Sequence, residues 1–235
     1  MIIAIDCGHN CIGDTGATGN GVFEDNVTWR VGQKLAVALA RQNIDARVVN
    51  PVRETSTVSL SLARRVANAN NAPAVLYISI HCNAFSNPSA KGTEVYSFPG
   101  NQAGLSLATK LSKAIADIYN TTNRGAKTAN FQVLRDTNMT AVLIELGFLT
   151  NKADCAAISD VRNDDKVVAA IVNAVVGTVF RSETDVPKVS LGKVVSSTFV
   201  AREALAIEPT LESPMLTYEY PVYDDVEGET TDDDE

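Results

Sequence analysis

The chain has little that would place it in a membrane or export it. No stretch of its 235 residues approaches the roughly 20 unbroken apolar residues that a membrane-spanning helix needs. The first apolar run already begins at Ile2, which leaves no room ahead of it for the basic and apolar regions of a secretory signal. We therefore expect a protein made in the cytoplasm without a signal peptide or a transmembrane segment, unless Met1 stands in for a removed leader.

Basic residues are also few. The formal net charge is −8, because 20 Lys and Arg residues face 28 Asp and Glu residues. Binding to nucleic acid by charge needs a stripe of Lys and Arg that displaces counterions from phosphates, and the sequence has no such stripe. Much of the acidity is local, since the part from Glu203 to Glu235 holds 12 acidic residues and no Lys or Arg. We expect no nucleic-acid partner.

Cysteine is too sparse to hold the fold together. Cys7, Cys11, Cys82 and Cys155 lack the C-x-x-C spacing of a structural zinc site. Their density is far below that of small secreted domains built on disulfides. The sequence therefore favours free thiols in a reducing compartment over a disulfide bridge.

Short β-branched segments alternate with segments of helical spacing along most of the chain. We predict strands at residues 2–6, 45–50, 75–81, 92–98, 131–134 and 141–146. Between and after them, we predict helices at residues 25–43, 58–71, 101–119 and 163–181. Such alternation is typical of an α/β fold with a largely parallel sheet that is covered by helices.

The composition changes after Ser182. Four prolines interrupt short mixed runs there, and the chain ends in the acidic sequence GETTDDDE. We predict a folded domain over residues 1–181, a short C-terminal extension over 182–222 and a disordered acidic tail over 223–235. Within the extension, residues 189–207 fit either a hairpin or a helix.

The two histidines of the chain each stand where a predicted strand ends. His9 follows the first strand, and His81 closes the third. The carboxyl ends of parallel strands open on one crevice, so both imidazoles are expected to point into the same place. Two neutral imidazoles, a carboxylate and an open position make a catalytic zinc site. Glu24, just ahead of the first predicted helix, is placed to supply the carboxylate.

Glu145 is the fourth candidate, because it lies between Ile144 and Leu146 in an apolar strand. A carboxylate there loses much hydration energy unless a cation or a function holds it. Taken singly, a strand-end histidine is more often a satisfied hydrogen-bonding residue than a ligand, and Glu24 would be a first-turn glutamate that the helix dipole favours. Together, the four residues favour a metal site over these separate interpretations.

These residues lie in segments that carry a resemblance to a known family. The sequence resembles the zinc-dependent N-acetylmuramoyl-L-alanine amidases (amidase type 3), which are peptidoglycan hydrolases. The resemblance is ordered along residues 1–181 and rests on IDCGHN, GVFEDN, SLSLARRVANAN, SIHCNAF, KGTEVY and NRGAKTANFQVLRDTNMTAVLIELGFLTN. It implies a twisted mixed sheet flanked by helices on both faces, with Zn²⁺ held by His9, Glu24 and His81 and with Glu145 as the catalytic glutamate.

The resemblance also implies the substrate, which is the amide bond between N-acetylmuramic acid and L-alanine in bacterial peptidoglycan. Metal-assisted hydrolysis itself follows from the residues, since zinc activates water and Glu145 can move its proton. The sequence departs from the family pattern at Cys7, where proline is usual, and at Cys11, where glycine is usual. Together with Cys82, these thiols are expected near the metal, where they could bind it or be oxidised.

Four further residues are weaker candidates. Asn83 could orient a ligand or contact substrate, but an Asn after a strand is more often a turn former. Arg65 and Arg124 could hold loops or bind carboxylates of the stem peptide, and otherwise they form a solvated face. Trp29 falls inside the first predicted helix, where core packing is favoured over sugar stacking.

Two other functions fit parts of the sequence. A zinc peptidase or carboxypeptidase that cuts within the stem peptide would use the same residues, and a non-catalytic wall-binding module could retain the same fold. A wall hydrolase without a leader fits a phage endolysin, which acts after release, or an enzyme carried by a phage-like particle. The C-terminal extension would then bind the wall, a partner or the particle.

Overall fold

The computed structural model describes residues 1–50 and 57–179 of the chain. The predicted extension at 182–222 and the predicted tail at 223–235 lie outside the described residues. None of the helices in the described part has the length and apolar character that crossing a membrane requires.

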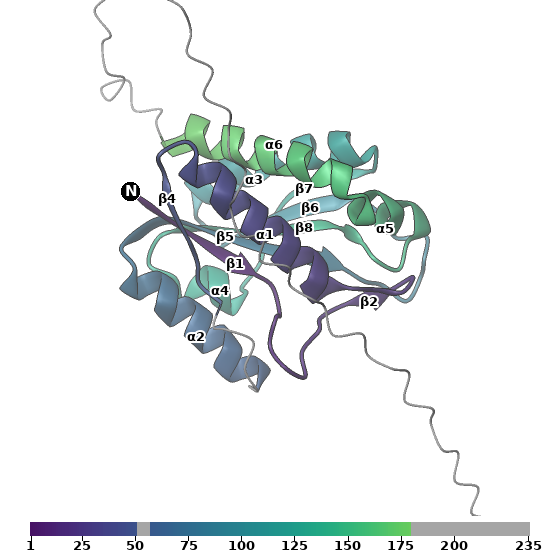
Figure 1. The fold of residues 1–235 in the computed structure, drawn as a ribbon, viewed down its shortest axis with the longest axis horizontal. Helices are drawn as coiled ribbons and strands as arrows, with labels where there is room; N and C mark the ends of the chain where they lie inside the picture. Colours follow the sequence, from purple (N-terminus) through teal and green to yellow (C-terminus); the bar gives the residue numbers. More distant parts are fainter. Residues whose placement is uncertain (51–56, 180–235) are drawn as a thin grey trace, which may run out of the picture. The chain divides into compact units, whose positions relative to one another are not determined.

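A six-stranded sheet forms the centre of the described part (Figure 1). In spatial order its strands are β4 (Asp45–Val48), β1 (Ile2–Cys7), β5 (Ala74–Asn83), β8 (Thr140–Phe148), β6 (Thr93–Ser97) and β7 (Asn123–Thr128). The first four run parallel, whereas β6 is antiparallel to β8 and parallel to β7. The mixed, largely parallel sheet is therefore confirmed.

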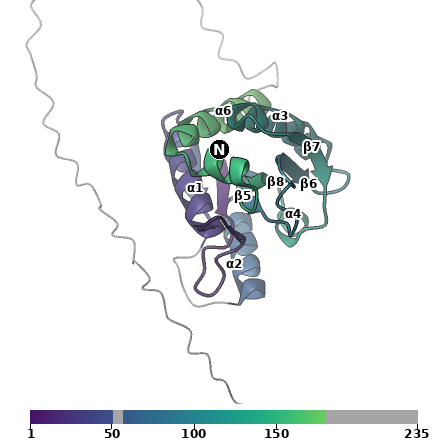
Figure 2. The same ribbon diagram turned by 90° about the vertical axis from the view of Figure 1, so that its right-hand side faces the viewer.

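Helices cover both faces of this sheet (Figures 1 and 2). One face carries α1 (Glu24–Ala40), α3 (Gln102–Tyr119) and α6 (Val161–Val179), with α5 (Lys152–Ser159) beside them. The opposite face carries the shorter pair α2 (Val58–Asn71) and α4 (Gln132–Arg135). A two-stranded hairpin of β2 (Thr18–Gly19) and β3 (Val22–Phe23) leads into α1.

The alternation of side chains along the strands decides which residues face which helices. On β5, Ile78 and Ile80 pack in the core under α1, α3 and α6, whereas Tyr77 packs in the core under α2 and α4. Because successive side chains of a strand point to opposite faces, His81 shares the face of Tyr77. On β8, the same rule places Glu145 on the face of Leu143, which packs in the core under α2 and α4.

The predicted elements differ from the structure at several places, and the hairpin of β2 and β3 is among the elements that were not predicted. Residues 131–134 were expected to form a strand, but they enter the short helix α4, in which the amide of Arg135 donates to the carbonyl of Phe131. The edge strand β7 was not predicted, because its sequence NRGAKT has almost no apolar residues. The closing helix is preceded by a separate helix, α5, whose first turn is capped by the side chain of Asn151.

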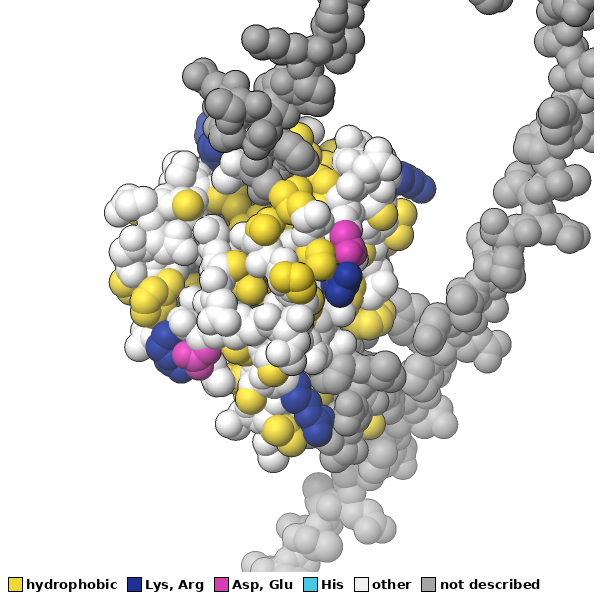
Figure 3. Space-filling model, turned by 90° about the vertical axis from the view of Figure 1, so that its left-hand side faces the viewer, with side chains coloured by type: hydrophobic (Ala, Val, Ile, Leu, Met, Phe, Trp, Pro, Cys, Tyr) yellow, Lys and Arg dark blue, Asp and Glu magenta, His cyan; other side chains and the backbone are white. Residues whose placement is uncertain are grey.

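The face near the start of β1 carries no visible histidine among the described residues (Figure 3). Its charged side chains are scattered and of both signs, and apolar side chains lie between them. Both histidines instead follow the carboxyl ends of β1 and β5, as expected for residues that share one crevice.

Candidate active site

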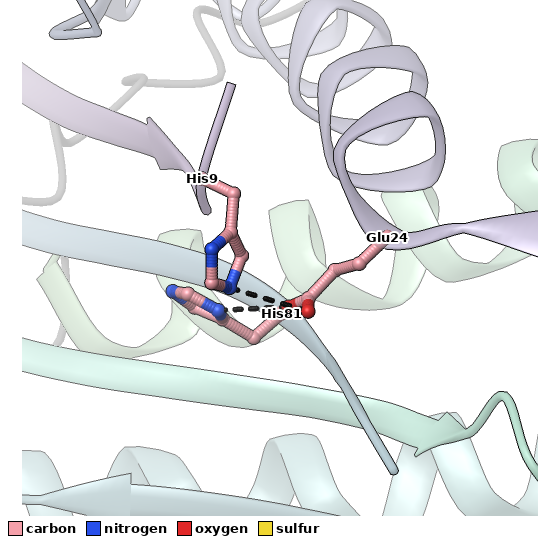
Figure 4. Close-up of side chains that lie close together, drawn as sticks. All are labelled: His9, Glu24 and His81. Atoms are coloured by element: carbon pink, nitrogen blue, oxygen red, sulfur yellow. Dashed lines mark hydrogen bonds and ion pairs between the residues drawn. The ribbon is translucent and has the colours of Figure 1, made fainter. Parts of the chain in front are cut away.

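His9, Glu24 and His81 come together from three elements (Figure 4). His9 lies two residues beyond β1, His81 lies near the end of β5, and Glu24 is the first residue of α1. The backbone at His9 is left-handed, with φ 63°, and the next residue, Asn10, has φ 58°. This bend turns the chain sharply after β1, so that the His9 ring lies over the end of β5.

The carboxylate of Glu24 lies between the two imidazoles. Its Oε2 is 3.2 Å from Nε2 of His9, and its Oε1 is 2.9 Å from Nδ1 of His81. The two rings are edge to face, with centroids 5.0 Å apart. The three side chains each offer one ligand atom, and these atoms lie within 4.8 Å of one another.

Two backbone amides donate hydrogen bonds to the carboxylate of Glu24 and hold it in place. The amide of Ala17 donates to Oε2 at 2.6 Å, and the amide of Cys82 donates to Oε1 at 2.8 Å. Burial would raise the pKa of Glu24, but the bonds with His81 and His9 outweigh burial and hold the pKa well below its usual range. Glu24 is therefore a fixed anion between two imidazoles.

Two glycines leave room for this arrangement. A Cβ at Gly8 would collide with the ring of His81, and a Cβ at Gly16 would collide with Glu24 and His9. Gly16 also has a positive φ of 70°, which side chains rarely adopt. Both positions therefore need glycine for the three side chains to meet.

Glu145 stands beside this cluster on the neighbouring strand. It pairs in register with His81 across β5 and β8, and the two side chains share a face of the sheet. Its Oε2 is buried and has no hydrogen-bond partner among residues 1–50 and 57–179. Burial, followed by the charges of Glu24 and Glu94, raises the pKa of Glu145 well above its usual value. An uncommitted carboxyl of raised pKa is suited to proton transfer.

Comparison with known proteins decides the family. The family described as N-acetylmuramoyl-L-alanine amidase matches residues 3–176. This chain belongs to the N-acetylmuramoyl-L-alanine amidase family. The resemblance predicted from the sequence motifs is thereby confirmed, and so is the expected fold, because amidase domains of known structure share it.

This amidase is similar to proteins of Bacillus subtilis and to an amidase of known structure. YqiI, an uncharacterised protein, is 34% identical over 177 residues, or 74% of this chain and 82% of that protein. The N-acetylmuramoyl-L-alanine amidase LytC is 36% identical over 172 residues, 72% of this chain. This chain spans only 34% of the length of LytC. The crystal structure of an N-acetylmuramoyl-L-alanine amidase from Clostridium difficile 630 has a TM-score of 0.68 and 31% identity, over 75% of this chain and 95% of that one.

The three clustered side chains of this amidase fit zinc. Zinc prefers imidazole nitrogens and carboxylate oxygens at about 2.0–2.2 Å in a tetrahedral set, and a catalytic site keeps one position open. Donor atoms 2.9 and 3.2 Å apart are close to the spacing of such a set. The backbone bonds to Glu24 and the glycine clearances show that this donor set is built before any ligand arrives.

Asp14 is a residue of the site that the sequence reasoning missed. Its Oδ1 lies 2.7 Å from Nδ1 of His9 and also accepts the amide of Gly16. With Nδ1 donating to Asp14, Nε2 of His9 is left to face Glu24 and a metal. The available signal was a carboxylate five positions after His9 in a glycine-containing loop, IGDTGATG.

Replacing Asp14 with alanine is expected to weaken zinc binding about 10–100-fold, because such outer partners orient the ligand imidazole. Asp14→Asn keeps an acceptor oxygen without the charge and is expected to fall between wild type and Asp14→Ala. Competition with a chelator of known affinity measures the three constants. Equal zinc affinity in all three proteins would show that Asp14 does not orient His9.

Zinc binding to the metal-free protein is expected to depend on pH through His9. Burial would lower the pKa of His9, but hydrogen bonds and charges from Glu24 and Asp14 outweigh burial and raise the pKa to about 9. Below that pH the imidazole carries a proton that zinc has to displace. The apparent zinc affinity should therefore rise about tenfold per pH unit from pH 7 to 8.5. An affinity that stays flat over this range, after correction for the competing chelator, would contradict the pKa of His9.

Glu94 is a second residue that the sequence reasoning missed. It lies opposite Glu145 on β6, and its carboxylate binds Arg124 and Lys127 of the edge strand β7. Burial would raise the pKa of Glu94, but hydrogen bonds from Lys127, Arg124 and Tyr96 lower it to about 2. The only sequence signal was a charged residue inside the strand motif GTEVY.

The four weaker candidates from the sequence lie in different parts of the structure. Arg65 is buried and donates to Asp6 at 3.0 Å, so it joins α2 to β1, and the expectation of a surface arginine on a solvated face is wrong. Trp29 packs against the core, as predicted. Asn83 is the last residue of β5 and donates to Glu94 at 2.9 Å, whereas Arg124 binds the same carboxylate.

The expected proximity of thiols to the metal is corrected for two cysteines. All four cysteines are free and buried. The side chains of Cys7 and Cys82 belong to the core under α1, α3 and α6, on the face of the sheet opposite His81. Burial also raises the pKa of both thiols, which disfavours the thiolate that metals bind.

Proposed function

We propose that this chain is a zinc-dependent amidase that hydrolyses the bond between N-acetylmuramic acid and the L-alanine of the peptidoglycan stem peptide. The observation that carries the proposal is the cluster of His9, Glu24 and His81 beside the unpartnered carboxyl of Glu145, on a fold of the amidase family. Membership of the family supports the substrate, and the donor set supports the metal.

The reaction needs a strong nucleophile and stabilisation of negative charge on the carbonyl oxygen, because a secondary amide is unreactive at neutral pH. Zinc, when bound by His9, Glu24 and His81, supplies a Lewis acid that activates water and polarises the carbonyl. Asp14 holds the imidazole of His9, and the amides of Ala17 and Cys82 hold the carboxylate of Glu24, which in turn contacts His81. The chain therefore provides a rigid donor set that needs little rearrangement.

Glu145 performs the proton transfers. Its carboxylate takes a proton from the attacking water as the new C–O bond forms, and it returns the proton to the alanine nitrogen as the C–N bond breaks. The products are the lactyl carboxyl group on the glycan and a free amine on the peptide. With a dication bound by the neighbouring donors, Glu145 would be held in its ionised form against the rise in its pKa that burial causes.

Digestion of purified peptidoglycan, followed by mass spectrometry of the products, tests the proposal. Wild-type protein with zinc should release intact stem peptides with a free L-alanine amine and leave glycan with free lactyl groups, and a chelator should abolish the release. Shortened peptides on intact glycan would instead identify a peptidase, and binding to the wall without release would identify a non-catalytic module. Either of these results would overturn the amidase proposal.

The biological setting stays a prediction from the sequence. Action on the wall after phage lysis, or delivery by a phage-like particle through residues 182–222, fits the proposed reaction. Delivery by a particle can be tested by pull-down of particle proteins. The full chain is compared with a chain that ends at residue 181. Equal capture by both proteins would exclude the extension as the binding segment.

A further inference from the structure

A second charged cluster lies next to the candidate metal site, and the proposed chemistry does not use it. The carboxylate of Glu94 is 4% exposed, whereas the side chains of Arg124 and Lys127 that bind it are 34% and 36% exposed. The anion is therefore buried beneath two cationic side chains that are partly exposed.

The bonds of Glu94 leave this cluster with one net positive charge. Its Oε2 accepts from Nε of Arg124 at 2.5 Å and from the ammonium of Lys127. Its Oε1 accepts from the side-chain amide of Asn83 at 2.9 Å and from the hydroxyl of Tyr96 at 2.7 Å. Each carboxylate oxygen thus has two donors, while both cations keep further N–H groups that Glu94 does not occupy.

Aromatic rings hold the two cations in place. The guanidinium of Arg124 lies 5.0 Å from the centre of the Phe148 ring, and the ammonium of Lys127 lies 5.8 Å from that of Tyr96. Both distances are within the range of cation–π attraction. The two side chains are therefore positioned before any ligand arrives, which lowers the entropy cost of binding an anion.

The cluster lies on the side of Glu145 away from His81, at a distance that a peptide can span. Glu94 pairs in register with Glu145 across β6 and β8, and β7 is the next strand. With strands about 4.8 Å apart, the cationic groups lie about 5–10 Å from Glu145. An extended peptide covers about 7 Å in two residues. A group on the second residue of the stem peptide can therefore reach the cluster while the scissile amide lies at Glu145.

A purely structural role accounts for only part of the cluster. One cation would neutralise Glu94 and fasten the edge strand β7 to β6. The second cation adds a charge that no described carboxylate in the cluster balances. Because both cationic side chains are partly exposed, a second pairing with Glu94 would add little stability through solvent. Arg65, the other arginine considered for substrate binding, is buried against Asp6 and is therefore not available.

We propose that Arg124 and Lys127, positioned by Glu94, bind the free α-carboxylate of the residue that follows L-alanine in the stem peptide. The inference rests on the proposed amidase function and adds a specificity to it. Substrates in which this carboxylate is free should be preferred over substrates in which it is a primary amide. The amide lacks the charge and offers one acceptor oxygen where the carboxylate offers two.

Two synthetic N-acetylmuramoyl peptides test the inference. They have the same length and differ only at the second residue, which is D-isoglutamate in one and D-isoglutamine in the other. The full-length, zinc-loaded protein should show a kcat/KM about 10–100-fold higher for the acid, since hydrogen bonds to charged groups contribute on this scale. Both rates are measured on the same sample, so any inactive fraction cancels from their ratio.

Variants locate the source of the preference. Lys127→Gln and Arg124→Gln should each reduce the acid-to-amide ratio to about threefold or less, and Lys127→Arg should retain most of it. Arg162→Gln, which removes an exposed arginine on α6, is the matched control and should keep the wild-type ratio.

Three results of these rate measurements would overturn the carboxylate subsite. Equal kcat/KM values for the two substrates with wild type would overturn the carboxylate subsite while leaving the amidase function intact. A wild-type preference that survives both glutamine variants would place the discrimination elsewhere and also overturn it. Failure of the wild type to cleave either substrate would overturn the amidase function, and the inference would fall with it.

Discussion

Glu145→Gln is expected to lower kcat by about 10²–10⁴-fold, the usual contribution of a positioned acid or base. Glutamine keeps the size of the side chain but can neither take a proton from water nor return one to the alanine nitrogen. Because Glu145 is not one of the three clustered donors, the variant should bind zinc as the wild type does. Steady-state rates on a muramoyl peptide, together with zinc content, measure both expectations.

The matched control for this variant is Asp164→Asn. Asp164 is a fully buried carboxylate that binds Arg30 between α1 and α6, on the other face of the sheet. Its replacement should reduce stability, because a buried ion pair loses one partner, while kcat of the folded protein changes little. If Glu145→Gln retained wild-type kcat, proton transfer by Glu145 would be excluded.

Glu24→Gln is expected to have the second-largest effect. Its zinc affinity should fall by more than about 100-fold, which is the largest loss usually caused by replacing a residue that only hydrogen-bonds a ligand. The substitution removes the only anion of the donor set and offers zinc a neutral amide oxygen. Activity at low zinc should disappear with the metal. Chelator competition and rates at increasing zinc concentration measure the effect.

Asp25→Asn is the control for Glu24→Gln, because Asp25 is also buried in the first turn of α1 but is not one of the clustered donors. Its zinc affinity should stay within a few-fold of wild type. Similar losses in both variants would mean that burial of charge in this turn, and not ligation by Glu24, controls metal binding.

Much of the fold followed from local patterns in the sequence. The helix predicted at 58–71 has those bounds, since its apolar positions repeat at helical spacing and Thr57 caps its start. The buried strands β1, β5 and β8 are rich in β-branched residues and were also predicted near their true bounds. Elements whose stability comes from neighbours were missed. Within the described residues, β7 pairs with β6 alone at the sheet edge, and α4 is a single helical turn that follows Phe131.

The candidate site was predictable to a similar extent. His9 and His81 follow from the rule that parallel strands share a crevice, and Glu145 follows from the cost of a carboxylate in an apolar strand. Asp14 and Glu94 could not be found this way, because their roles depend on contacts made only after folding. The face on which each cysteine lies also needed strand register, which the sequence does not specify.

The most direct test of the account is anomalous diffraction at the zinc absorption edge from crystals of the zinc-loaded protein. We expect one peak bonded to His9, Glu24 and His81 at about 2.0–2.3 Å, with the carboxyl of Glu145 beside it and outside bonding distance. A peak at other residues, or the absence of a peak at this cluster in active, zinc-containing crystals, would contradict the central claim.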